Sequence, residues 1–267
     1  MKLLKKHCQQ FLKQYNMKIL VIPDIHGRCF WRLHVNNIDK YDKVVFLGDY
    51  VDPYGPENIT EEDAVLNLKN IIEFKKRFSD KVVLLLGNHD LHYASPLFYK
   101  HACGGRISRR YYNDIKHLFD DNHDLFQIAY DTPNVLFTHA GVMQEWTFKY
   151  NIEPTADALN VFWDKNDLTY FVDISYVRGG YGNVGSCVWS DVSEKIEYDE
   201  NSELINATGI AKYQIFGHTL QISLEDYKNK GIWRFWLPVI NKYWSMLDTA
   251  HAYEVDDNDL PNSIHEI

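Results

Sequence analysis

Five short apolar runs, each followed by small polar residues, constrain the fold of this chain more than any other feature. They are KILVI (18–22), KVVFL (43–47), KVVLLL (81–86), NVLF (134–137) and YQIF (213–216). Each has the length of a strand and is rich in β-branched or aromatic residues. Several lack polar alternation, which is typical of strands in sheets covered on both faces. The chain is therefore predicted to have an α/β fold.

The segment between the second and third runs is predicted to be a helix. Thr60 and Asp63 match a capping box, and an apolar stripe at helical spacing follows them. The first half thus has the order βαβαβ, which implies a parallel sheet with right-handed crossovers. Further helical stretches are expected near 92–120 and 154–167. The aromatic runs IWRFWL and NKYWSML are expected to be antiparallel strands of a second sheet.

No repeat, low-complexity tract or proline-rich linker divides the 267 residues, so one domain is expected over 17–255. Residues 1–16 are expected to be an N-terminal extension, either an amphipathic helix docked on the body or a poorly ordered segment. The acidic residues 256–267 are expected to form a frayed C-terminal tail.

Charge and cysteine usage narrow the class of protein. A net charge of −9 argues against broad binding of nucleic acid or of anionic membranes. No run approaches the length of a signal peptide core or a membrane span. The four cysteines lack CxxC or ladder spacing and are expected to be reduced thiols. These features together predict a cytoplasmic protein.

Each of the five runs ends in a polar motif: PDIHG, GDYVD, GNHD, THAG or GHT. Ligands of open α/β sheets bind beyond the carboxyl ends of the strands, so the side chains of these motifs are expected to share one site. A single Asp, Asn or His after a strand is more typical of a turn or a structural hydrogen bond. Five such ends with glycines beside them favour a common site. The expected site residues are Asp24, His26, Asp49, Asn88, His139 and His218.

These six side chains are oxygen and nitrogen donors without a thiolate, which suits Mn, Fe, Zn or Co. A single ion in an open catalytic site keeps about three protein ligands, so six donors predict two ions. Asp49 is the expected carboxylate bridge between them. The ions would give an acidic chain a local positive charge for a phosphate dianion. A water shared by both ions would be the nucleophile.

The leaving group of such a reaction requires a proton. His89 follows Asn88 directly and is the expected general acid, and Asp52 is the expected carboxylate that orients it. The alternative for Asp52 is a turn carboxylate before Pro53.

The five motifs, in this order and spacing, resemble those of the calcineurin-like metallophosphoesterases over roughly residues 18–250. Within that superfamily they resemble the phosphoprotein phosphatase branch and the bacterial diadenosine tetraphosphatases. The resemblance implies a four-layer α/β/β/α sandwich of two mixed sheets with a dinuclear Mn or Fe/Zn site. It assigns one metal to Asp24, His26 and Asp49, the other to Asp49, Asn88, His139 and His218, and the acid pair to His89 and Asp52.

The sequence departs from the branch at Pro53, where the GDxVDRG motif has an arginine that contacts phosphate. Another arginine is therefore expected to bind the substrate, because a guanidinium can hold phosphate bidentately. Arg28 and Arg178 are the preferred pair, and Arg106 and Arg109 are the other candidates.

The expected function is metal-dependent hydrolysis of phosphomonoesters, with phosphoserine or phosphothreonine proteins or small phosphorylated metabolites as substrates. One alternative is hydrolysis of dinucleoside polyphosphates or nucleic-acid end phosphates. For this, a tyrosine near the motifs would stack on a base; the candidates are Tyr50, Tyr54, Tyr93 and Tyr181. The other alternative is an inactive scaffold, which predicts broken ligand motifs.

Overall fold

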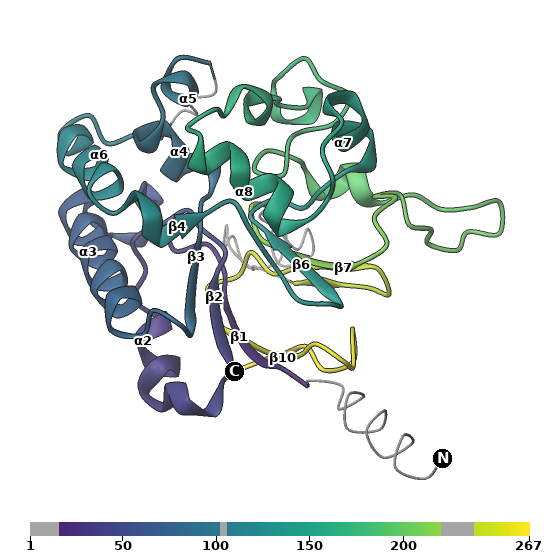
Figure 1. Ribbon diagram of the computed structural model, residues 1–267, viewed down its shortest axis with the longest axis horizontal. Coiled ribbons are helices and arrows are strands. Elements are labelled where there is room, and N and C mark those ends of the chain that lie inside the picture. The colour runs from purple at the N-terminus through teal and green to yellow at the C-terminus, as the bar shows by residue number, and fades with distance from the viewer. Residues whose placement is uncertain (1–15, 102–105, 220–237) are drawn as a thin grey trace, which may run out of the picture.

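The computed structural model describes residues 16–101, 106–219 and 238–267. Its strands are β1 Lys18–Ile22, β2 Lys43–Phe46, β3 Val82–Leu85, β4 Phe126–Gln127, β5 Ala129–Asp131, β6 Val135–Thr138, β7 Tyr213–Phe216, β8 Val239–Ile240, β9 Trp244–Met246, β10 Tyr253–Asp256 and β11 His265–Glu266. Over these described residues they form one sheet in the order β11-β10-β1-β2-β3-β4 and another in the order β5-β6-β7-β9-β8. The two sheets face each other, as expected for the sandwich (Figure 1).

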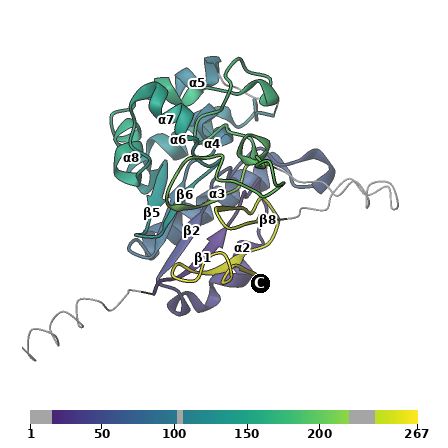
Figure 2. The same ribbon diagram turned by 90° about the vertical axis from the view of Figure 1, so that its right-hand side faces the viewer.

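The helices lie on the outer sides of the two sheets. They are α2 Trp31–His34, α3 Glu61–Arg77, α4 Asn88–Ala94, α5 Pro96–His101, α6 Tyr112–Asp120, α7 Gln144–Tyr150 and α8 Ala156–Asp164. In Figure 1, α2, α3 and α6 flank the first sheet, and in Figure 2, α7 and α8 lie beside β5 and β6. The predicted capping box of α3 is confirmed, with Asp63 N donating to Thr60 Oγ1 over 3.0 Å.

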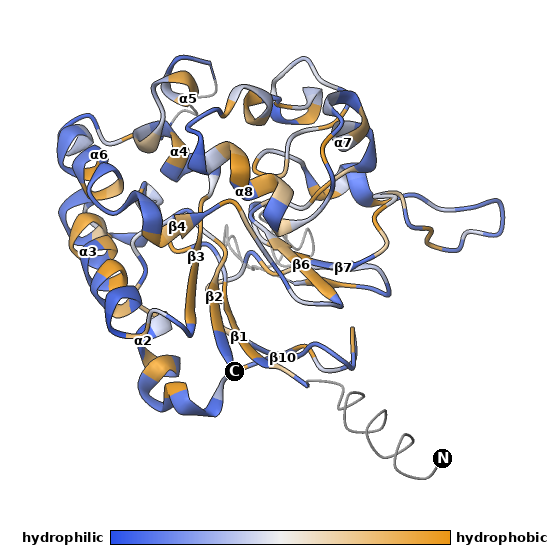
Figure 3. Ribbon diagram, viewed as in Figure 1, coloured by the Kyte–Doolittle hydropathy of each residue, from blue (hydrophilic) through white to orange (hydrophobic). Residues whose placement is uncertain are grey.

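The apolar strands are buried on both faces. This confirms the prediction that runs without alternating polar residues belong to a sheet covered on both sides. Ile19 and Val21 of β1 pack between the sheets against residues of β6 and β7, including Phe137. Their neighbours Leu20 and Ile22 face the opposite way, into the layer that contains α3. Figure 3 shows the same pattern, with apolar colour concentrated on the central strands and on one side of the surrounding helices.

The parallel order of the first three strands is confirmed, since β1 pairs with β2 and β2 with β3 in parallel. The five runs are divided between the sheets, because β6 and β7 belong to the second sheet. The chain changes sheets at one buried residue, Ile128, which separates β4 of the first sheet from β5 of the second. Antiparallel pairing of β5 with β6 then places β6 opposite the first sheet.

The end of the chain differs from the prediction of a frayed tail. β11 pairs with β10, and Ile264 is buried in the layer between the sheets. Asp257 also accepts a hydrogen bond from Met17 N at 3.0 Å. The tail is ordered because it carries an apolar side chain that completes the core.

The prediction of antiparallel strands in the aromatic runs near the C-terminus is confirmed in part. In NKYWSML, β9 pairs antiparallel with β8 but parallel with β7. IWRFWL and residues 1–15 lie outside the described residues. Cys29 and Cys187 are free thiols, as predicted, and the other two cysteines fall outside the described ranges. Among the residues described, no helix combines the length and apolarity that crossing a membrane requires.

Lys195 is fully buried, and its ammonium makes hydrogen bonds to Ser190 and to the backbone oxygen of Asp191. Burial lowers the pKa of Lys195 to about 8 from 10.5. Between these two pH values the unfolded chain keeps the proton and the folded chain releases it, so the Lys195 contribution to stability increases with pH. The free energy of unfolding of the wild type, relative to Lys195→Met, is expected to rise by up to ~3 kcal/mol from pH 7 to pH 10.5.

Urea unfolding of both proteins at the two pH values measures this difference. Lys69→Met, on the exposed face of α3, is the control for removing a lysine from the surface. A wild-type advantage over Lys195→Met that stays constant with pH would contradict the expectation.

Candidate metal centre

The carboxyl ends of five strands, from both sheets, bring the six predicted donor residues together. Asp24 and His26 follow β1, and Asp49 and Asn88 follow β2 and β3. His139 and His218 follow β6 and β7 of the second sheet. All six are buried, with none more than 9% exposed. The side chains therefore converge at the seam between two sheets.

These residues form two overlapping groups that could each hold a cation. In one, single ligand atoms of Asp24, His26 and Asp49 lie within 4.8 Å of one another. In the other, the same is true of Asp49, His139 and His218. Asp49 belongs to both groups, which is the arrangement a bridging carboxylate requires.

The spacing within the second group fits the ligand sphere of a cation. His139 Nε2 lies 3.1 Å from Asn88 Oδ1, 3.1 Å from His218 Nδ1 and 3.5 Å from Asp49 Oδ2. Ligands of one tetrahedral cation, at bond lengths of about 2.0–2.1 Å, are about 3.3 Å apart. A single ring N–H cannot serve three acceptors at once, so the cluster matches metal ligation better than a hydrogen-bond network.

Hydrogen bonds to backbone carbonyl oxygens orient two of the imidazole rings. His26 Nδ1 lies 3.0 Å from the carbonyl oxygen of Val51, and His139 Nδ1 lies 2.8 Å from that of Leu47. Donation from Nδ1 to a carbonyl leaves the lone pair of Nε2 directed at the cluster, as in known metal sites. Both rings therefore direct Nε2 at the cluster. Burial lowers the pKa of His139, but the carboxylates of Asp49 and Asp24 raise it to about 10.

The turns that carry the donors have unusual backbone conformations. His26, Asp49, Asp52 and His218 all have positive φ, between 42° and 68°. This region is uncommon for residues other than glycine and costs about 1–3 kcal/mol per residue. Such strain concentrates at functional sites, where the surrounding structure holds the chain in place.

Two glycines allow the turns to close around the carboxylates. A Cβ atom on Gly87 would lie 2.1 Å from Asp49 Oδ1, and one on Gly217 would lie 2.0 Å from Asp24 Oδ1. No side chain can be accommodated at these distances. The glycine that precedes Asn88 and the glycine that precedes His218 are therefore required by the packing of the site.

Burial and neighbouring charges shift the pKa values of the donor residues. Burial opposes ionisation of Asp49, but the rings of His139 and His89 hold the pKa of its carboxyl well below the usual range. Burial and the nearby Asp248 carboxylate raise the pKa of Asp24 well above its usual value. Burial is also the main cause that lowers the pKa of His26 and His218, so both rings are neutral and carry a free lone pair.

The predicted acid pair lies beside this cluster. His89, in the first turn of α4, has its Nδ1 2.7 Å from Asp52 Oδ2. The hydroxyl of Tyr93 donates to the other oxygen of Asp52. His89 N donates to Asp49 Oδ1 over 3.0 Å, which ties the pair to the donor cluster. Asp52 is 4% exposed, and its contacts with His89 and Tyr93 favour the acid pair over the alternative of a turn carboxylate.

Sequence reasoning gave no role to two buried carboxylates of the site. Asp90 accepts hydrogen bonds from the backbone N–H groups of Gly87, Asp49 and Tyr50 over 2.7–2.8 Å and so joins two of the donor turns. Asp248 follows β9, and burial raises its pKa to about 6. Both could have been identified from the sequence, because each is an aspartate that follows a strand, as in the other motifs.

The preferred substrate-binding arginines already have acidic partners. Arg28 is 7% exposed, and its Nε and Nη2 lie 3.1 Å from the carboxylate of Glu57. Arg178 Nε lies 2.7 Å from Asp191 Oδ2. Both guanidinium groups border the donor turns, because Arg28 donates to the backbone oxygen of Asp24 and Arg178 to that of His218. Arg109 is exposed and lines a hollow beside α6.

The candidate base-stacking tyrosines are mostly unavailable to a ligand. Tyr50 is fully buried and donates to the carbonyl oxygen of Leu85, and Tyr93 is bonded to Asp52. Tyr181 is fully exposed. Tyr54 packs edge-on against His26, with ring centroids 4.8 Å apart, and is the member of the set that contacts the donor cluster.

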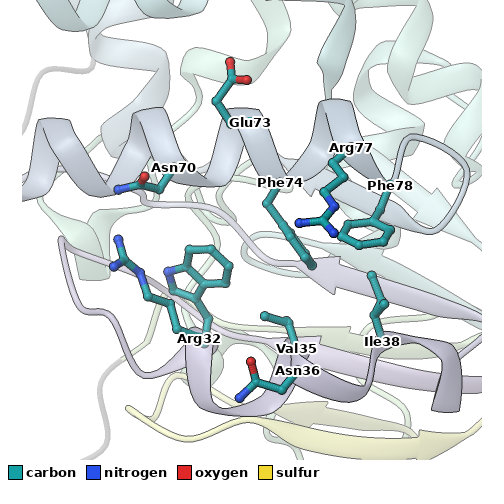
Figure 4. Close-up of a pocket in the computed structure, with 10 residues that line it drawn as sticks. Arg32, Val35, Asn36, Ile38, Asn70, Glu73, Phe74, Arg77 and Phe78 are labelled. Carbon is teal, nitrogen blue, oxygen red and sulfur yellow. The ribbon is translucent and has the colours of Figure 1, made fainter.

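A separate hollow of about 490 Å³ lies between α2 and α3 (Figure 4). Phe74 and Phe78 line it, with Arg32, Asn70 and Arg77 around them. None of its lining residues belongs to the strand-end motifs, so it is distinct from the donor cluster.

The family model described as calcineurin-like phosphoesterase matches residues 17–221. A solved cold-active protein-tyrosine phosphatase of a psychrophile, Shewanella sp., is similar with a TM-score of 0.53 and 14% identity, covering 91% of this chain and 76% of that chain. Another structure titled as a cold-active protein tyrosine phosphatase has a TM-score of 0.52 and 14% identity, covering 91% and 74%. At this identity the likeness concerns the fold. No curated protein matches the chain.

Proposed function

The chain belongs to the calcineurin-like phosphoesterase family, and from this premise we propose that it hydrolyses phosphomonoesters with the help of two bound cations. The observation that carries the proposal is that Asp49 is shared by two groups of buried donors, with the His89–Asp52 pair beside them. This combination supplies two cation sites and one proton donor in the same small volume. A protein that served only as a metal-free scaffold would not require this set of donor residues.

Asp24, His26 and Asp49 would hold one cation, and Asp49, Asn88, His139 and His218 the other. The donor set suits Mn²⁺ best in our proposal and is also compatible with Fe and Zn. When bound, the two cations would neutralise charge on the phosphate oxygens and acidify a water molecule for attack on phosphorus.

The residues of the chain have defined tasks in this scheme. Asp52 accepts from His89 Nδ1, which leaves His89 Nε2 to deliver a proton to the oxygen of the leaving group. Asp52 thereby acts as the positioning residue of the acid. Asp90 holds the turns of Asp49 and Gly87 together and so keeps both donor groups in register.

We propose phosphoserine or phosphothreonine proteins and small phosphorylated metabolites as the substrates. The solved relatives are titled as tyrosine phosphatases, so a phosphotyrosine peptide belongs in the same panel. Dinucleoside polyphosphates are the enzymatic alternative, and they receive little support because Tyr50 and Tyr93 are buried and hydrogen-bonded. Initial rates on all these compounds, measured side by side with added Mn²⁺, separate the classes.

Removal of metal is expected to abolish turnover. After dialysis against a chelator, hydrolysis of a chromogenic phosphomonoester should fall by at least about 10³-fold, because several kcal/mol of transition-state stabilisation are lost. Added Mn²⁺ should restore it, and elemental analysis should find two metal ions per chain. Turnover that survives chelation, or one ion per fully active chain, would contradict the proposal. An inactive scaffold would show no metal-dependent turnover at all.

A further inference from the structure

The guanidinium of Arg106 lies next to the proposed acid. Its Nη1 donates to the backbone oxygen of Asp52 over 2.7 Å, and its Nη2 lies 3.4 Å from His89 Nε2. We infer that Arg106 is the arginine that binds the phosphate group of the substrate, although it belongs to none of the strand-end motifs. The inference rests on the proposed function, because it assumes that a phosphomonoester occupies this site.

Tyr54 holds the guanidinium in place. The Arg106 guanidinium carbon lies 3.6 Å from the centroid of the Tyr54 ring, a close cation–π contact. Tyr54 is in turn packed against the ring of His26. The GDYVDPYG motif thus has no arginine at Pro53, but its next residue provides the aromatic surface on which an arginine from elsewhere in the chain is stacked.

The charge of Arg106 is available to a ligand, whereas the charges of the two preferred arginines are not. Glu57 neutralises Arg28, and Asp191 neutralises Arg178. Within residues 16–101, 106–219 and 238–267, no carboxylate forms an ion pair with Arg106. A guanidinium without an acidic partner, beside a buried cluster of metal donors, is suited to receive an anion.

The geometry also indicates which part of the ligand Arg106 contacts. Arg106 Nη2 and His89 Nε2 lie 3.4 Å apart. An anionic oxygen placed between them would accept from both. A terminal phosphate of a monoester offers several such oxygens, so the pair favours a dianionic monoester over a diester.

The test uses Arg106→Gln in the full chain loaded with Mn²⁺. Its affinity for inorganic phosphate, measured by calorimetry, is expected to fall by at least about tenfold, the usual effect of losing a hydrogen bond to a charged group. Arg110→Gln is the matched control, because Arg110 also lies over a tyrosine ring, that of Tyr111 at 5.1 Å, but is exposed. Metal content should match the wild type in both variants.

Turnover separates phosphate binding from an indirect effect through Asp52. A phosphate-binding role lowers kcat/KM equally for esters with good and poor leaving groups, whereas disturbance of the acid pair would spare good leaving groups. Arg106→Lys keeps the positive charge but loses the bidentate geometry of the guanidinium, so it is expected to retain only part of the phosphate affinity. This variant replaces Arg106→Gln in the test if Arg106→Gln does not fold.

Unchanged phosphate affinity in Arg106→Gln or Arg106→Lys, loss of metal, or selective loss on poor leaving groups would overturn the inference. Failure of the wild type to bind phosphate would overturn it as well. Metal-dependent turnover of the wild type is measured independently of these variants. A wild type that hydrolyses phosphomonoesters while the Arg106 variants behave as controls would leave the proposed function standing and reject this role alone.

Discussion

Asp49→Asn is expected to lower kcat by at least about 10³-fold and to reduce the bound metal from two ions per chain. Asp49 is shared by both donor groups, so an amide in its place provides one weak neutral ligand where two cations need a charged one. The loss of several kcal/mol of electrostatic stabilisation corresponds to this factor. Steady-state kinetics and elemental analysis of the same preparations measure both effects.

The control for this variant is Asp257→Asn. Asp257 is also a buried aspartate, but it accepts a hydrogen bond from Met17 N, at the opposite end of β1 from the donor cluster. It should lose stability without losing specific activity or metal in the folded fraction. An Asp49→Asn protein that keeps full turnover with two ions bound would refute the bridging role.

His89→Ala is expected to keep both metal ions and to slow hydrolysis of esters with poor leaving groups by about 10²–10⁴-fold, the usual contribution of a positioned acid. Activated aryl esters need no proton on the departing oxygen, so their rates should change much less. A plot of log kcat against leaving-group pKa should therefore be steeper for the variant.

Asp52→Asn is the matched partner of that experiment. It keeps the shape of the side chain that contacts His89 Nδ1 but removes its charge, and should give the same dependence on the leaving group. If His89→Ala lowered the rates of all esters by the same factor, His89 would not be the acid.

Local sequence was sufficient to predict strands β1, β2, β3, β6 and β7, helix α3 and the polar residues that follow those strands. A strand is recognisable from five or six neighbouring apolar residues, and the Thr60 capping box involves residues only three positions apart. The polar motifs follow their strands directly, so their location beyond strand ends could be inferred without knowing how the strands pair.

Contacts between distant residues could not be inferred in this way. Asp90 was contained in a motif already noted, yet its role depends on N–H groups some 40 positions away in the chain. Arg106 was one of several candidate arginines, and nothing local distinguishes it from Arg28. Both guanidinium groups lie over the Tyr54 ring, Arg106 at 3.6 Å and Arg28 at 5.4 Å from its centroid, so only the position of Glu57 shows that the charge of Arg28 is neutralised.

The sequence by itself thus determined which candidate donor side chains follow the strands and where along the chain they stand, because strand length, turn chemistry and donor type are properties of a few consecutive residues. The tertiary structure alone decided that the donors come from two facing sheets, and that the C-terminal strand completes the core. It also decided which arginine lies beside the acid. These outcomes depend on packing between segments separated by tens to hundreds of residues. The hydrophobic effect that drives this packing is non-directional, so the apolar residues of one segment do not specify the segment against which they pack.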